Sequence, residues 1–84
     1  MLGALKIEIK ETEKILIELL KKQTEAKKRE KIQMLYWLKT RQAESVAHLA
    51  VLLGYHRTTI SRWLTKYRRG GIEELLEIKK SSDR

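Results

Sequence analysis

Hydrophobic residues recur with helical spacing along most of the chain, and no proline interrupts them. The pattern predicts an all-α fold. In chain order, the predicted helices span about 11–22, 24–39, 46–53, 56–69 and 72–78.

Residues that favour helix ends mark several of these boundaries. Thr24 and Ser45 are the expected N-caps of the second and third helices. Gly54 is expected to end the third helix in a left-handed conformation, and Gly70 with Gly71 to end the fourth. The third and fourth helices are therefore predicted to be joined by a sharp glycine turn.

The first nine residues have a different pattern, because apolar and charged side chains alternate from Leu5 to Ile9. That period is typical of an extended segment. We therefore expect a short extended arm before the first helix. The chain divides on this basis into an arm and first helix over 1–23, a main domain over 24–78, and a polar tail over 79–84.

The main domain has the spacing of a helix-turn-helix motif. A small residue, Ala50, stands four positions before Gly54, where the second helix of such a motif crosses the first. The residues expected to pack inward are Leu49, Leu53, Tyr55, Ile60 and Trp63. The spacing alone also fits an ordinary helical hairpin with a glycine turn. We predict a homeodomain-like helix-turn-helix bundle with one additional N-terminal helix.

The charge of the chain narrows the choice of partner. Nineteen Lys and Arg against eleven Asp and Glu give a net charge of +8, which favours nucleic acid or an acidic membrane surface. No apolar run approaches the roughly 18 residues of a membrane span. The cations are concentrated in 21–31 and 56–69, and the second of these segments contains no acid. Without a cysteine, the chain offers no disulfide and no thiolate metal site.

On a helical wheel, one side of the predicted fourth helix carries only hydroxyl and basic side chains, opposite Ile60. Solvated helix faces usually mix charges, so an acid-free face favours binding in the major groove of duplex DNA. Arg57 and Arg62 can make bidentate contacts to guanine O6 and N7, and Thr58 and Ser61 can reach base edges or a thymine methyl group. Among the other polar residues of this helix, His56, Thr59, Thr65 and Lys66 are better placed for phosphates. The complete set of predicted DNA-binding residues is His56, Arg57, Thr58, Thr59, Ser61, Arg62, Thr65 and Lys66.

Three features admit two interpretations each. His56 could contact a phosphate or merely cap the helix. The cations at 27–31 could provide solubility or hold the DNA backbone beside the groove. Trp37 and Trp63 could stack on unpaired bases, but aromatic residues at helical spacing favour the core.

The segment SVAHLAVLLGYHRTTISRWLTKYRRGGIEELL, residues 45–76, resembles the N-terminal DNA-binding region of bacterial insertion-sequence transposases related to the mariner superfamily. The preceding KKREKIQMLYWLKT is similar to the second helix of that family. The resemblance implies binding to the terminal inverted repeats of a mobile element, with DNA cleavage by a separate catalytic domain that this sequence lacks. His56 departs from the family, which usually has a small capping residue there.

The function predicted from these features is sequence-specific binding of duplex DNA, as the DNA-binding part of a transposase. A small stand-alone transcription regulator is the alternative, and a basic helical protein that binds membranes or a protein partner is a rival of another class. We expect no enzymatic activity, no metal, no cofactor, no small-molecule ligand and a cytoplasmic location.

The N-terminal third has more apolar surface than one core requires. Ile15, Leu16, Ile17, Leu19 and Leu20 span about 200° of the first helix, whereas a core-facing stripe needs about 100°. Residues 1–23 could therefore form a homodimer interface. A closed monomer, in which this helix and the arm cover the second helix completely, is the alternative.

Overall fold

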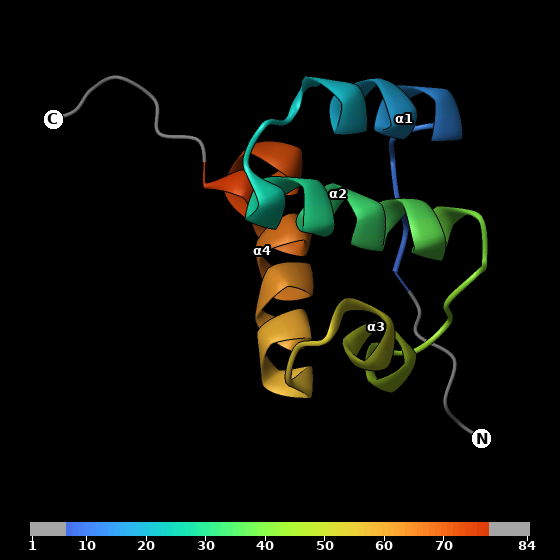
Figure 1. Cartoon of the computed structure of the whole chain (residues 1–84), viewed down its shortest axis with the longest axis vertical. Coiled ribbons are helices and arrows are strands. Elements are labelled where there is room, and N and C mark those ends of the chain that lie inside the picture. Colours follow the sequence, from blue (N-terminus) through green and yellow to red (C-terminus); the bar gives the residue numbers. More distant parts are fainter. Residues whose placement is uncertain (1–6, 78–84) are drawn as a thin grey trace, which may run out of the picture.

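The computed structural model describes residues 7–77, and Figure 1 shows the arrangement of the chain. Within that range the regular structure is helical and includes no strand, which confirms the predicted all-α class. The helices are α1 (Glu13–Lys22), α2 (Ala26–Lys39), α3 (Val46–Leu53) and α4 (Arg57–Leu76).

Helices α1 and α2 form a hairpin across the top of Figure 1. Thr12 caps α1, because its hydroxyl accepts a hydrogen bond from the amide of Ile15 at 3.2 Å. The predicted cap of α2 is wrong, since Glu25 and not Thr24 occupies that position and provides no side-chain cap. The amide of Gln23 bonds to the carbonyl of Leu19 at the end of α1. The connection to α2 is one residue longer than expected, because its cap is Glu25.

The predicted N-terminal arm is only partly described, since residues 1–6 lie outside the described range. Residues 7–10 have no regular secondary structure, and Ile9 is buried. The ammonium of Lys39 donates to the carbonyl oxygen of Ile9 at 3.0 Å. This part of the arm therefore packs on its own chain.

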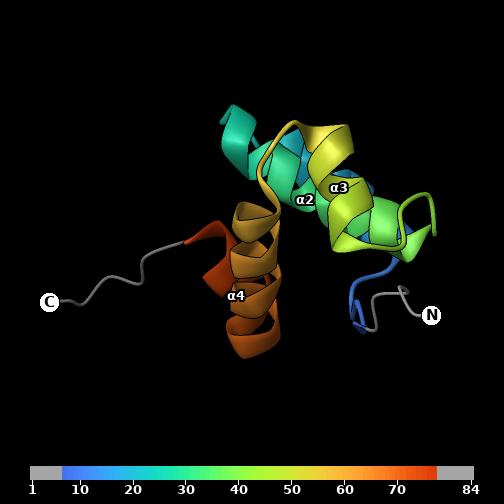
Figure 2. The ribbon, with the colours of Figure 1, turned by 90° about the horizontal axis from the view of Figure 1, so that it is seen from below.

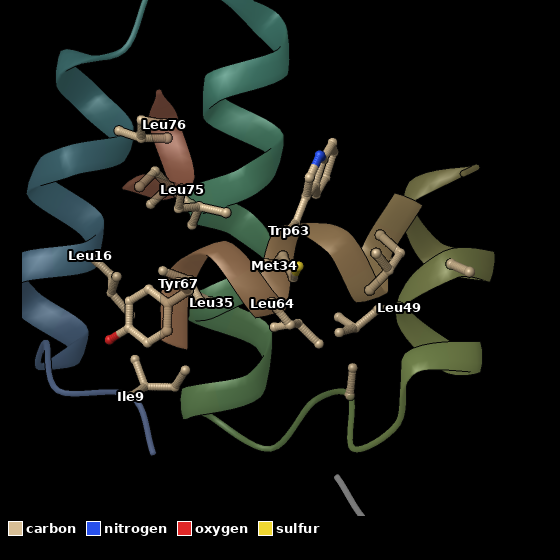
Figure 3. Packing of buried hydrophobic residues seen from close by; sticks show 14 residues of the cluster. Ile9, Leu16, Met34, Leu35, Leu49, Trp63, Leu64, Tyr67, Leu75 and Leu76 are labelled. Carbon is tan, nitrogen blue, oxygen red and sulfur yellow. The ribbon is translucent and has the colours of Figure 1, made fainter. Parts of the chain in front are cut away.

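One hydrophobic core joins all four helices to the N-terminal segment, as Figure 3 shows. Leu16 of α1, Leu35 of α2, Leu49 of α3 and Leu64 of α4 are all buried. Full burial of such a side chain stabilises a fold by about 1.5 to 3 kcal/mol before the cost of ordering the chain. The additional N-terminal helix thus shares the core of the helix-turn-helix domain.

The connection between α3 and α4 has the predicted geometry. The hydroxyl of Ser45 caps α3 by accepting from the amide of His48 at 3.0 Å. Gly54 is left-handed, with φ 79° and ψ 27°, and its amide bonds to the carbonyl of Ala50 at 2.8 Å. Ala50 is buried, as expected where two helices approach closely. Figure 2 shows α3 and α4 on either side of this turn.

Helix α4 consists of two helices joined by a reversal at Gly71, where φ is 71° and ψ is −155°, as predicted from the Gly70–Gly71 pair. The helix after the reversal ends at Leu76, two residues before the predicted end. Leu75 and Leu76 are buried and lie between α1 and α2 in Figure 3. We refer to residues 72–77 as the closing segment, because it returns the chain to the core.

Gly54 and Gly71 both have a positive φ, but they differ in the backbone cost that another residue would incur there. A side chain on Gly54 or Gly71 would meet no atom within 4 Å, so any cost arises from the backbone conformation. Alanine in the left-handed helical region costs about 1 to 2 kcal/mol. The conformation of Gly71 lies in a region that is essentially restricted to glycine.

We expect Gly71→Ala to lower the free energy of unfolding by about 2 to 3 kcal/mol and by more than Gly54→Ala does, because only the former forces alanine toward a glycine-only region. Urea denaturation of both variants and the unsubstituted chain measures the difference. Equal losses for the two variants would contradict a sharp reversal at Gly71.

Candidate nucleic-acid interface

The buried side of α4 determines which of its residues face outward. Ile60, Trp63, Leu64 and Tyr67 are at most 6% exposed and face the core. Because residues three and four apart share one face of a helix, the intervening positions point away. The exposed residues on this outward face are Arg57, Thr58, Ser61, Arg62 and Thr65.

No acidic residue occurs between Glu44 and Glu73, so the outward face of α4 contains only hydroxyl groups and cations. Among residues 7–77, neither the Arg57 nor the Arg62 guanidinium forms an ion pair. Each guanidinium therefore keeps its planar set of donors for an external acceptor such as a base or a phosphate.

The structure assigns His56 a capping position, which is one of its two predicted roles. Its Nδ1 accepts a hydrogen bond from the amide of Thr58 at 3.2 Å and lies 3.2 Å from the hydroxyl of the same residue. Thr59 is half-buried, and its amide bonds to the carbonyl of His56 at 3.0 Å. Phosphate contacts by these two residues stay predictions.

Lys66 has surroundings unlike those of the other predicted DNA-binding residues. It is half-buried and forms an ion pair and hydrogen bond with Glu77 of the closing segment. Further along α4, Arg69 lies 3.9 Å from the carboxylate of Glu74, although both side chains are exposed and such pairs contribute little. The closing segment therefore places carboxylates beside Lys66 and Arg69 of α4.

The second group of cations has largely structural contacts. The guanidinium of Arg29 donates to the carbonyl of Leu20 at 2.5 Å, at the C-terminal end of α1. Lys28 pairs with Glu25 at 3.8 Å. Lys31 is buried, with its ammonium 5.4 Å from the ring centroid of Trp63. Lys31 is therefore not a solvated cation, whereas Lys27 and Arg29 are exposed, and the roles in solubility or in holding the DNA backbone stay predictions for them.

The aromatic residues near the turn belong to the core and its edge. Trp63 is buried, as expected, and Trp37 is half-buried. Tyr55 packs edge-on against Trp63 with ring centroids 5.0 Å apart. Its hydroxyl donates to the carboxylate of Glu30, and this bond raises the pKa of Tyr55. This contact, which ties the turn to α2, has no signal in the local sequence pattern.

A second tyrosine connects α4 to the N-terminal segment. The hydroxyl of Tyr67 donates to the carboxylate of Glu11 at 2.6 Å and accepts from the amide of Lys10 at 3.0 Å. Figure 3 shows this hydroxyl directed toward the N-terminal segment, near Leu16. The sequence predicts that Tyr67 faces inward, but it does not indicate these partners.

The three-helix arrangement of α2, α3 and α4, the left-handed glycine turn and the exposed basic face of α4 define a helix-turn-helix DNA-binding fold. The family model described as a helix-turn-helix domain matches residues 30–83, which is more than half of the chain. The chain belongs to this helix-turn-helix family. No significant match is found among curated proteins or among solved structures.

Two further observations concern membranes and metal ions. None of the helices in the described residues is both long and apolar enough to cross a membrane. Within residues 7–77, histidine and acidic side chains do not gather in any group of three or more that could hold a metal ion.

Tyr67 should make the stability of the domain depend on alkaline pH. Burial, together with the hydrogen bond to Glu11, raises the pKa of Tyr67 to about 12 from its ordinary value of 10.0. Below pH 10 the tyrosine is protonated in both the folded and the unfolded chain. As the pH rises from 10 to 12 the unfolded chain loses the proton first, so this contribution to stability is lost.

We therefore expect the stability advantage of the unsubstituted chain over Tyr67→Phe to shrink by up to about 2 kcal/mol between pH 10 and 12. Urea denaturation of both proteins at several alkaline pH values measures that difference. A constant difference across the range would contradict the buried, hydrogen-bonded state of this hydroxyl.

Proposed function

We propose that this chain recognises the terminal inverted repeats of a mobile DNA element, as the DNA-binding part of a transposase, and reads duplex DNA with the outward face of α4. The observation that carries the DNA-reading part is the combination of free guanidinium groups and short hydroxyl side chains on that face, with no carboxylate among them. This set of groups suits base edges flanked by phosphates.

The proposed contacts divide by side-chain chemistry. Arg57 and Arg62 would each make a bidentate contact to guanine O6 and N7, the commonest specific contact in the major groove. Thr58 and Ser61, with short side chains, would reach base edges or a thymine methyl group. Thr65 would contact a phosphate, as would His56 and Thr59 near the N-terminal end of α4.

The transposase assignment is supported by the resemblance of residues 45–76, including the ending GGIEELL. In the structure this ending forms the reversal and the buried closing segment, so it is an integral part of the domain. A stand-alone transcription regulator would use the same face of α4 and remains the second candidate. A membrane-binding or protein-binding role has less support, because the apolar side of α4 is buried in the core and is not exposed to a partner.

We propose no enzymatic activity, cofactor or small-molecule substrate for this chain. Glu74 and Glu77 pair with cations of α4. They therefore have a local electrostatic role that requires no metal. Binding to DNA in the cytoplasm is the proposed setting.

The first test separates base reading from attraction to the DNA backbone. Arg62→Ala should weaken binding to the preferred duplex by about 1 to 3 kcal/mol and relax its sequence preference, because a bidentate base contact is lost. Lys14→Ala is the matched control, since it removes the same charge from exposed α1. Fluorescence anisotropy with specific and random duplexes measures both. Equal losses on the two duplexes would contradict base reading by Arg62.

The second test addresses the transposase assignment. Selection of bound sequences from a random duplex pool should yield a site that occurs in inverted orientation at both ends of a mobile element in the source genome. A selected site found only upstream of genes would favour the transcription regulator instead.

We also propose homodimerisation through residues 1–23, with exposed apolar residues of α1 in the interface. Ile15 and Ile17 are 47% and 39% exposed and lie about 100° to either side of the buried Leu16. Apolar surface thus remains uncovered along both flanks of α1. The described part of the arm is packed on its own chain, so it is not a candidate for pairing with a second copy.

In sedimentation experiments at tens of micromolar, about the range in which weak interfaces fill, the unsubstituted chain should form a dimer. Ile15→Glu combined with Ile17→Glu should give a folded monomer, because charges then replace the uncovered apolar groups. Glu18→Gln, on the exposed side of α1, should remain dimeric. A monomeric unsubstituted chain would contradict this proposal and leave DNA binding unaffected.

A further inference from the structure

Glu77 occupies a fixed position at the end of the closing segment. It is left-handed, with φ 59°, and its amide bonds to the carbonyls of Glu73 and Glu74. The two preceding residues, Leu75 and Leu76, are buried in the core. The backbone that carries the Glu77 carboxylate is therefore anchored by the packing of Leu75 and Leu76 and by the bonds of its amide to the preceding helical turn.

This carboxylate lies between two ammonium groups. It bonds to Lys66 of α4, and its Oε2 is also 3.9 Å from the ammonium of Lys31 in α2. Burial lowers the pKa of Lys31, and the charge of Glu77 acts in the opposite direction. A buried ammonium group is costly without a partner. The charge of Lys31 therefore favours the ionised Glu77 carboxylate at its present position.

Lys66 would otherwise be well placed for DNA. It follows Arg62 by four residues, which puts the two side chains on neighbouring turns of the same side of α4. Its side chain is still 35% exposed, so the ammonium is not sealed in the core. Without Glu77, Lys66 would add a second free cation beside Arg62 on this side of α4.

We propose that Glu77 is a specificity-determining residue, which keeps Lys66 from contacting DNA phosphates and so lowers the affinity for duplexes of any sequence. Attraction to phosphates supplies essentially all non-specific binding, whereas base contacts distinguish sequences. Removing one phosphate contact while sparing Arg57 and Arg62 therefore increases the ratio of specific to non-specific binding. This inference rests on the proposed reading of duplex DNA by α4.

The test releases Lys66 without changing the net charge. Lys31→Met combined with Glu77→Gln removes one cation and one anion, and methionine leaves no buried ammonium in need of a partner. On a random duplex, the slope of log affinity against log salt should steepen by about 0.9, since one more phosphate contact forms. The double variant should thus lose about threefold more affinity than the unsubstituted chain between 50 and 200 mM salt.

Two matched variants assign the effect to Lys66. Lys31→Met alone should keep the slope of the unsubstituted chain, because Glu77 still holds Lys66. Adding Lys66→Ala to the double variant should restore that slope. Thermal melting verifies that each variant is folded. As a measurement that does not depend on the double variant, Lys66→Ala alone should leave the slope unchanged, because Lys66 does not contact phosphate.

An unchanged slope in the folded double variant would overturn the role of Glu77, as would a slope reduced by about 0.9 in Lys66→Ala alone. Either result, together with sequence-selective binding by the unsubstituted chain, would leave the proposed function standing. If the unsubstituted chain bound no duplex, both the proposed function and this inference would fail.

Discussion

The orientation of α4 depends on one buried stripe, formed by Ile60, Trp63, Leu64 and Tyr67, and the exposure of its basic face follows from it. Because these side chains occupy a single side of the helix, their burial determines which residues remain exposed. The left-handed turn at Gly54 brings α3 against the same stripe. The two tyrosine bonds, from Tyr55 to Glu30 and from Tyr67 to Glu11, hold the ends of the stripe to α2 and to the N-terminal segment.

The sequence pattern predicts those parts of the fold that depend on local chemistry. The Ser45 cap, the Gly54 turn and the burial of Ile60 and Trp63 are confirmed, because each follows from spacing within one or two turns of helix. The inward side of α4 and its exposed cations could be derived in the same way. The Thr24 cap was wrong because the length of the turn after α1 depends on how α1 and α2 pack.

Contacts between distant residues could not be derived from local patterns. The cations at 27–31 look alike in the sequence, yet Arg29 bonds to the end of α1 and Lys31 is buried beside Trp63. The partner of Lys66 lies beyond the reversal at Gly71, so helical periodicity gives no indication of it. The prediction that Lys66 contacts phosphate treated α4 as an isolated helix, so it took no account of Glu77.

The closing segment combines two physical requirements in six residues. Leu75 and Leu76 complete a small core, which a domain of this size needs because it buries a limited fraction of its surface. The same return brings Glu77 to the side of α4, where the carboxylate neutralises the cation nearest the core. Arg57 and Arg62 lie closer to the N-terminal end of α4 and form no ion pair with Glu77. The packing of the closing segment thus also affects the charge along α4. The cations that form no ion pair within residues 7–77, Arg57 and Arg62, lie toward the beginning of the helix.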